Sequence, residues 1–332
     1  MKMSKVSLEE DERNKRQAFI DTPHFFLHNR KLCNYKGFWL PEKAVTNVEL
    51  LSEGFTPRPT DVFIASLPKC GMTWLKGLAF ATLNRTNYSP LTSIPHPLLT
   101  LNPHDCVPFL ELTIQGLNLS YVESMPSPRL LSFHLTPSML PTSITDAFSN
   151  CRIIYVCRET KDVFTSSWHF YQTLMESVGM KSPLIDHFFE SFCGGRVPYG
   201  PIWEHVLEYW RESQQKPNKV LFLRYEEMIE DPRRILKMIA QFMGCEFSKE
   251  EENMGLVDKL VELCDFNRLS NTEENKHGCI IGHNLNIKKS LLFRKGLVGD
   301  WANLLTPEMA QRLDEITDEI TQEKFNGSGL NF

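Results

Sequence analysis

The sequence lacks features that would assign it to several common classes of protein. None of its nine cysteines forms a C-x-x-C pair, so reduced thiols in a cytoplasmic protein are the simplest account. No stretch approaches the roughly 18 apolar residues of a membrane-spanning helix. A net charge of −5 argues against a general nucleic-acid-binding protein, which needs a broad basic surface. We therefore expect a protein that binds neither membranes nor nucleic acid.

Two phosphate-binding motifs are also missing. The sequence contains no G-x-x-x-x-G-K-[ST] motif, which speaks against a nucleotide kinase, and no G-x-G-x-x-G motif, which leaves a dinucleotide-binding enzyme without support. The first 17 residues are dense in charge and lack the apolar core of a secretory signal. We expect residues 1–20 to form a flexible arm and residues 21–332 to form one domain.

Apolar runs typical of buried strands alternate with helix-forming segments. Strands are predicted at residues 61–67, 129–134, 151–158 and 220–225, and helices at residues 73–84, 161–175, 201–213, 232–243, 249–264 and 306–324. A Pro-rich connection covers residues 90–108, and residues 266–293 are predicted to form a loop or lid. The alternation predicts an α/β fold in which a central parallel sheet is flanked by helices.

Four chemically useful side chains fall at or just beyond the predicted strand ends. They are Lys69, His134, Arg158 and Tyr225. Ligands of such sheets bind at the carboxyl ends of the strands, so these four residues are expected along one rim.

The loop at residues 68–74 is the strongest local signal. It follows a predicted strand and precedes a predicted helix, so its backbone N–H groups and the helix dipole point at one spot where an anion can bind. Lys69 adds a positive charge there, and Thr73 adds a hydroxyl. On these residues alone, the alternative is a turn that only joins a strand to a helix.

Three motifs in order resemble the cytosolic sulfotransferase family. They are P-K-x-G-x-T-W at residues 68–74, R-x-x-K-D-x-x-x-S at residues 158–166 and R-K-G-x-x-G-D-W at residues 294–301. The resemblance extends from about residue 37 to residue 332 and is strongest to the plant branch, on the side of the flavonol and desulfoglucosinolate enzymes.

The resemblance implies a binding site for 3′-phosphoadenosine 5′-phosphosulfate (PAPS), the sulfuryl donor, and no metal. A P-loop-like segment would hold the 5′-phosphosulfate, and other residues would hold the 3′-phosphate, with Tyr225 close to the adenine or that phosphate. The residues expected at the 5′ end are Lys69, Cys70, Gly71, Met72, Thr73 and Trp74, and those expected at the 3′-phosphate are Arg158, Ser166, Arg294, Lys295 and Gly296.

The same resemblance implies the chemistry. Sulfuryl transfer to a hydroxyl needs a base, and His134 stands in the family's H-[LI]-x-x-x-x-[LM]-P context. Lys69 would stabilise charge on the oxygen that bridges phosphate and sulfate. From the residues alone, His134 could equally be one of ten histidines that happens to follow a strand.

Two positions depart from the family pattern. Cys70 and Met72 replace hydroxyl-bearing residues, so donor binding is expected to weaken, and a donor-binding homologue with little catalysis is the alternative. An exposed Cys70 thiol with a lowered pKa would also make the loop sensitive to oxidation. The animal dimerisation motif K-x-x-x-T-V-x-x-x-E keeps only Thr306 here, which favours a monomer.

The acceptor is expected to be a small hydroxylated metabolite, with a flavonoid as the first choice. Relatives of the plant branch also use steroids, hydroxyjasmonates and desulfoglucosinolates, so these remain alternatives. Five aromatic residues either line the acceptor pocket or belong to the core: Phe38, Trp39, Phe109, Phe170 and Tyr171.

Overall fold

A computed structural model describes residues 32–113, 119–146, 149–280 and 287–325. The predicted arm over residues 1–20 and the start of the predicted domain lie outside these ranges. The described chain begins with an antiparallel hairpin, β1 (Leu32–Tyr35) and β2 (Phe38–Pro41). Phe38 and Trp39 are buried in the hydrophobic core, so these two aromatic residues belong to the core rather than to the acceptor pocket.

The centre of the molecule is a four-stranded parallel sheet, as predicted. Its strands are β3 (Val62–Ala65), β4 (Leu130–Phe133), β5 (Arg152–Cys157) and β6 (Val220–Arg224), in the order β4-β3-β5-β6. β3 pairs with both β4 and β5, and β6 pairs with β5. All four strands therefore end at the same edge of the sheet.

Alternate residues of the strands pack against different helical layers. On β3, Val62 and Ile64 pack with α3 (Met72–Leu83), α12 (Pro232–Met243) and α14 (Leu256–Leu263). Phe63 and Ala65 face the other layer, which contains the hairpin, α2 (Glu42–Gly54) and α10 (Ile202–Gln215). Because both faces are covered, the strands are apolar throughout rather than alternating with polar residues. The described residues thus form an α/β domain.

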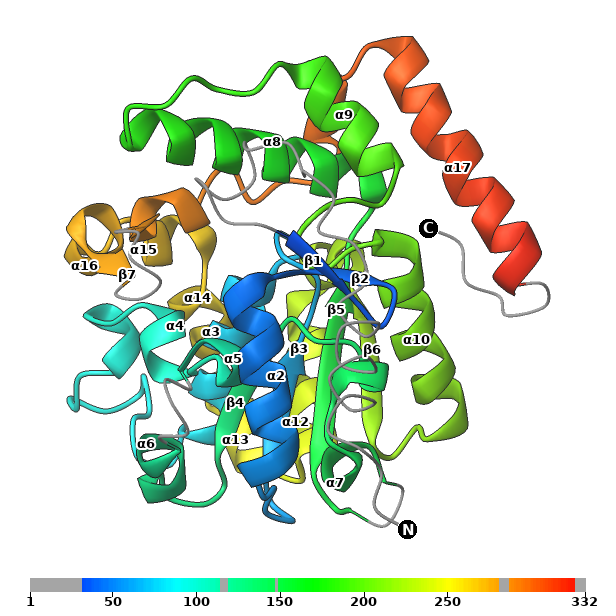
Figure 1. The fold of residues 1–332 in the computed structure, drawn as a ribbon. Helices are drawn as coiled ribbons and strands as arrows, with labels where there is room; N and C mark the ends of the chain where they lie inside the picture. The colour runs from blue at the N-terminus through cyan, green and yellow to red at the C-terminus, as the bar shows by residue number, and fades with distance from the viewer. Residues whose placement is uncertain (1–31, 114–118, 147–148, 281–286, 326–332) are drawn as a thin grey trace, which may run out of the picture.

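The remaining helices surround these layers. At the carboxyl edge of the sheet, α8 (Thr160–Ser177) and α9 (Ile185–Cys193) lie at the top of Figure 1, beside α17 (Pro307–Phe325). The shorter helices are α4 (Pro103–Cys106), α5 (Leu110–Thr113), α6 (Ser120–Ser124), α7 (Thr142–Thr145), α11 (Tyr225–Glu230), α13 (Lys249–Asn253), α15 (Phe266–Ser270) and α16 (Glu273–His277), with 3-10 turns η1 (Pro97–Leu99), η2 (Pro137–Met139), η3 (Lys289–Leu292) and η4 (Asp300–Asn303). None of the helices in the described ranges has the length and apolar character to cross a bilayer.

Two predictions about local structure are wrong, and some helices were not predicted. The helix predicted over residues 249–264 is interrupted at Gly255, whose φ of 72° is left-handed and separates α13 from α14. Helix α9 was not predicted at all. The loop or lid predicted over residues 266–293 contains α15, α16, η3 and the short strands β7 (Cys279–Ile280) and β8 (Ile287–Lys288).

The buried Lys289 explains why this last segment is packed rather than open. Its Nζ donates to Asp105 Oδ2 and to Glu274 Oε1, both at 2.6 Å. Asp105 belongs to α4, so the ion pairs hold η3 against the structure that forms inside the Pro-rich connection. Residues 281–286 lie outside the described ranges.

Candidate active site

A cavity of about 780 Å³ opens at the carboxyl edge of the sheet. The four side chains predicted to gather at the strand ends all line it. Eight further predicted residues also line it: Gly71, Met72, Thr73, Trp74, Ser166, Arg294, Lys295 and Gly296. The cavity therefore brings together every predicted site residue except Cys70.

The loop before α3 makes the turn that presents Lys69. Lys69 and Gly71 both have left-handed backbones, with φ of 73° and 98°. A side chain at Gly71 would clash with the Tyr225 ring, because an added Cβ would lie 2.5 Å from its Cδ2 atom. Glycine is thus required here both by conformation and by the close approach of Tyr225, the first residue of α11. The first free N–H groups of α3 follow directly.

Lys69 lies in the cavity without a carboxylate partner among the described residues. Its Nζ is 4.2 Å from the centroid of the Phe170 ring and 3.5 Å from the Leu291 carbonyl oxygen. Burial, together with the charges of Arg158 and Arg294, lowers the pKa of Lys69 to about 7. A bound anion would offset both effects and favour the charged form.

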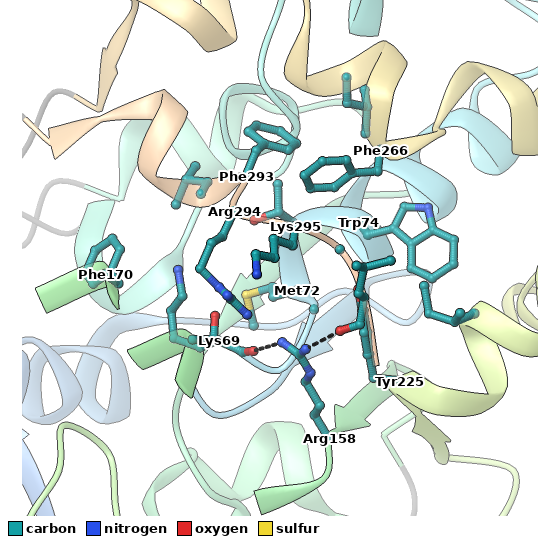
Figure 2. A pocket seen from close by; sticks show the side chains of 18 of the residues that line it. Lys69, Met72, Trp74, Arg158, Phe170, Tyr225, Phe266, Phe293, Arg294 and Lys295 are labelled. Carbon is teal, nitrogen blue, oxygen red and sulfur yellow. Dashed lines mark hydrogen bonds between the residues drawn. The ribbon is translucent and has the colours of Figure 1, made fainter. Parts of the chain in front are cut away.

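Arg158 is held between the loop and the segment after Arg294. Its guanidinium donates to the carbonyls of Lys69 (3.5 Å) and Leu297 (2.7 Å), and it lies 4.6 Å from the centroid of the Tyr225 ring. Figure 2 shows the side chains of Arg158, Lys69 and Arg294 at one end of the cavity. Three cations therefore gather around one space.

Asp162 fixes the segment that carries Arg294. Its carboxylate accepts from the backbone N–H groups of Gly299 (2.8 Å) and Trp301 (3.1 Å). Asp300 in turn pairs with Arg294 and with Lys295. The first turn of α8 thus positions a segment that lies far away in the sequence, since Asp162 and Gly299 are 137 residues apart.

His134 has a defined tautomer. Its Nδ1 lies 2.6 Å from the Ser66 carbonyl oxygen, which can only accept, so Nδ1 carries the proton and Nε2 keeps its lone pair. Burial lowers the pKa of His134 to about 3, so the imidazole is neutral near pH 7. The His134 backbone N–H donates to Glu111 Oε1 at 2.7 Å, which fixes the strand end. A neutral imidazole with a free Nε2 can accept a proton.

Cys70 departs from the predicted site. Its side chain does not line the cavity and is 1% exposed, packed in the core on the other side of the loop. Burial raises the pKa of its thiol to about 12. Neither condition for an oxidation-sensitive loop, an exposed thiol or a lowered pKa, is met.

His104 lines the cavity but was missed as a site residue. Asn102 caps α4, accepting from the His104 N–H at 2.8 Å, and Pro103 occupies the first helical position. The ring of His104 is stacked with Phe109, 5.2 Å between centroids, and Phe109 lies 4.8 Å from the His134 ring. An Asn-Pro pair is a helix-start signal, and it could have placed His104 on a short helix inside the Pro-rich connection.

No group of three or more His, Cys, Asp or Glu side chains is arranged to hold a metal ion in the part of the chain that the structure describes.

Comparison with known proteins identifies a family that this chain matches over most of its length. The family model described as "Sulfotransferase domain" matches residues 59–329. Cytosolic sulfotransferase 7 of Arabidopsis thaliana is 44% identical over 306 residues, covering 91% of this chain and 90% of the relative. Cytosolic sulfotransferase 5 of the same plant is 42% identical over 305 residues and 91% of each chain.

Two solved structures are also similar. A putative steroid sulphotransferase from Arabidopsis thaliana has a TM-score of 0.70 at 32% identity and covers 100% of this chain and 99% of its own. A mouse sulfotransferase complexed with PAP has a TM-score of 0.67 at 26% identity and covers 89% of this chain and 95% of its own.

Proposed function

This chain belongs to the sulfotransferase family, and on that premise we propose that it transfers a sulfuryl group from PAPS to a hydroxyl of a small metabolite. The observation that carries the proposal is one cavity in which Lys69, Arg158 and Arg294 lie near a neutral His134. The complex of the mouse relative with PAP supports PAPS as the donor. The names of the plant relatives support a cytosolic enzyme. We also propose a monomer, because the animal dimerisation motif keeps only Thr306 in this sequence.

The cations provide the donor site. We assign the 3′-phosphate to Arg158, Ser166, Arg294, Lys295 and Gly296, because phosphate oxygens match the planar guanidinium fork. The 5′ end of the donor is assigned to Lys69, to the amides at the start of α3 and to Thr73. Cys70 contributes only its backbone to this loop, and Met72 contributes a thioether to the wall.

Lys69 and His134 supply the chemistry. Sulfuryl transfer, like phosphoryl transfer, is an in-line displacement that depends on positioning and charge stabilisation. Lys69 stabilises the negative charge that develops on the bridging oxygen as the S–O bond to the donor breaks. His134 Nε2 takes the acceptor's hydroxyl proton while that oxygen forms its bond to sulfur.

The walls near His134 favour an apolar acceptor frame. Phe109, Phe170 and Tyr171 line the cavity together with Ile280 and Leu292. Aromatic walls of this kind suit a flat, apolar molecule that carries a hydroxyl, so we propose a flavonoid or similar metabolite. The likeness to a putative steroid sulphotransferase makes a steroid the leading alternative, ahead of hydroxyjasmonates and desulfoglucosinolates.

Transfer of labelled sulfate tests the proposal. The protein is incubated with ³⁵S-labelled PAPS and EDTA, together with flavonoids, steroids, hydroxyjasmonates and desulfoglucosinolates in separate reactions. We expect labelled product with at least one acceptor class, and transfer that is about 10²- to 10³-fold slower with the Lys69→Met variant. Tight binding of 3′-phosphoadenosine 5′-phosphate (PAP) without any transfer would indicate a donor-binding homologue instead.

A further inference from the structure

Three polar side chains form a continuous hydrogen-bonded line from the cavity into the core. Thr73 Oγ1 is 2.9 Å from His104 Nε2, and His104 Nδ1 is 2.8 Å from Lys76 Nζ. Thr73 and His104 line the cavity, whereas Lys76 is fully buried behind them on α3. None of these contacts is explained by the roles assigned to Lys69 and His134.

Lys76 sets the direction of the hydrogen bonds. Its Nζ lies 2.9 Å from the Val107 carbonyl oxygen and 3.4 Å from the centroid of the Phe109 ring, two groups that receive N–H donors. Burial lowers the pKa of Lys76, and the charges of Glu111 and Asp105 oppose that shift. The ammonium form has three N–H groups and no lone pair, so in this form Lys76 donates to His104 Nδ1 and the His104 proton lies on Nε2.

The consequence falls on Thr73. With Nε2–H donating, Thr73 Oγ1 accepts, and its own O–H is left to donate into the cavity. Thr73 is the only hydroxyl-bearing residue within residues 68–74, because Cys70 and Met72 stand where the family pattern has hydroxyls. The Thr73 hydroxyl is therefore the one side-chain hydroxyl of this loop that can donate a hydrogen bond to a bound anion.

We propose that His104 and Lys76 are positioning residues that hold the Thr73 hydroxyl as a hydrogen-bond donor to the anionic 5′ end of the donor. The proposal rests on the proposed function, which places that end at Thr73. The placement of His104 does not depend on a ligand. The Asn102 cap fixes its backbone, and the ion pair between Asp105 and Lys289 fixes its helix.

A double-mutant cycle on PAP binding tests the line. Thr73→Val, Lys76→Met and the double variant are compared by calorimetry with two matched controls, Thr82→Val on the same helix and Lys219→Met at the opposite edge of the sheet. Thr82 Oγ1 donates to the Leu78 carbonyl and Lys219 Nζ to the Cys151 carbonyl, both buried and outside the cavity. We expect Thr73→Val and Lys76→Met each to weaken PAP binding about tenfold, and the double variant to bind no more weakly than Thr73→Val. Independent effects that multiply to about a hundredfold, or a Lys76→Met affinity equal to that of Lys219→Met, would overturn the proposal.

Nitrogen NMR of the wild-type protein provides a readout that does not depend on any variant folding. We expect the proton of His104 on Nε2 and that of His134 on Nδ1, so the two cavity histidines are opposite tautomers. A proton on His104 Nδ1 would overturn the proposal. The proposed function fails separately: absence of transfer from PAPS, with the cycle and the tautomer as expected, would refute sulfuryl transfer and leave the line from Lys76 to Thr73 standing.

Discussion

The two ends of the cavity use burial in different ways. At the donor end, burial and the nearby charges of Arg158 and Arg294 lower the pKa of Lys69 to about 7. At the base end, burial lowers the pKa of His134 to about 3, so the ring is neutral, and the Ser66 carbonyl fixes its proton on Nδ1. A bound anion would therefore stabilise the charged form of Lys69 at the donor end, whereas the imidazole at the base end is unprotonated whether or not an anion is bound.

This contrast indicates a division of labour. Substitutions at the donor end should act on affinity and on charge stabilisation, and substitutions at the base end should act on proton transfer alone. The following experiments test whether the two ends can be separated in this way.

Replacing Lys69 should have the largest effect among the donor-end residues. We expect Lys69→Met to lower kcat by about 10²- to 10³-fold, because a charge that stabilises the leaving oxygen is lost. Single-turnover transfer at saturating PAPS measures the effect. Lys219→Met is the matched control, since it removes a buried lysine outside the cavity. A kcat equal to that of the control would remove Lys69 from the chemistry.

Replacing Arg158 should affect binding rather than turnover. We expect Arg158→Met to weaken PAP binding by about ten- to a hundredfold, because charge-assisted hydrogen bonds are lost, while kcat at saturating PAPS changes little. Calorimetry with PAP measures the first and steady-state kinetics the second. Arg233→Met serves as the control, since Arg233 is exposed on α12 and does not line the cavity. A loss in kcat without a loss in affinity would contradict the division.

The pH dependence of PAP binding should report on Lys69. Because its lowered pKa is about 7, the free protein carries this charge below that pH and loses it above, so affinity should decline several-fold as pH rises through about 7. The phosphates of PAP titrate in this range as well. Their titration affects the wild type and the Lys69→Met variant equally, so the difference between the two pH profiles reports on Lys69. Identical pH profiles for the two proteins would rule out titration of Lys69.

Treatment of the native protein with a thiol reagent should have the smallest effect on sulfuryl transfer. We expect Cys70 to remain unlabelled by a thiol reagent in the native protein and to react only after unfolding, because it is buried and burial raises its pKa. Mass spectrometry of labelled peptides measures this, with the partly exposed Cys193 as the comparison. Rapid labelling of Cys70, with loss of transfer, would contradict this prediction and support a loop that is sensitive to oxidation.

The two ends also differ in how far they could be predicted from the sequence. The donor end is encoded in contiguous motifs. Lys69 and Arg158 follow apolar strands, and parallel strands bring such ends together, whereas Arg294 was predicted only through the resemblance to the sulfotransferase family. At the base end His134 was predicted in the same way as Lys69, but its tautomer, like the link from Thr73 to His104 at the donor end, depends on contacts between distant segments: His134 meets Ser66 across 68 residues and Thr73 meets His104 across 31. Periodicity carries no information about such contacts.

Local sequence likewise could not decide which way a side chain points. Cys70 was expected in the site because of its place in the loop, yet the left-handed backbone at Lys69 and Gly71 turns it into the core. The interruption at Gly255 had a visible signal, a glycine within a long helical pattern, that a helix-former count overlooks.

Transfer and binding measured together on His134→Ala test the central claim most directly. The claim is that a neutral base and a cationic donor site act separately in one cavity. It predicts that His134→Ala loses about 10²- to 10⁴-fold in single-turnover sulfuryl transfer while its affinity for PAP matches that of the wild type and of His96→Ala, a buried histidine outside the cavity. Transfer at the wild-type rate, or a parallel collapse of PAP binding, would contradict it.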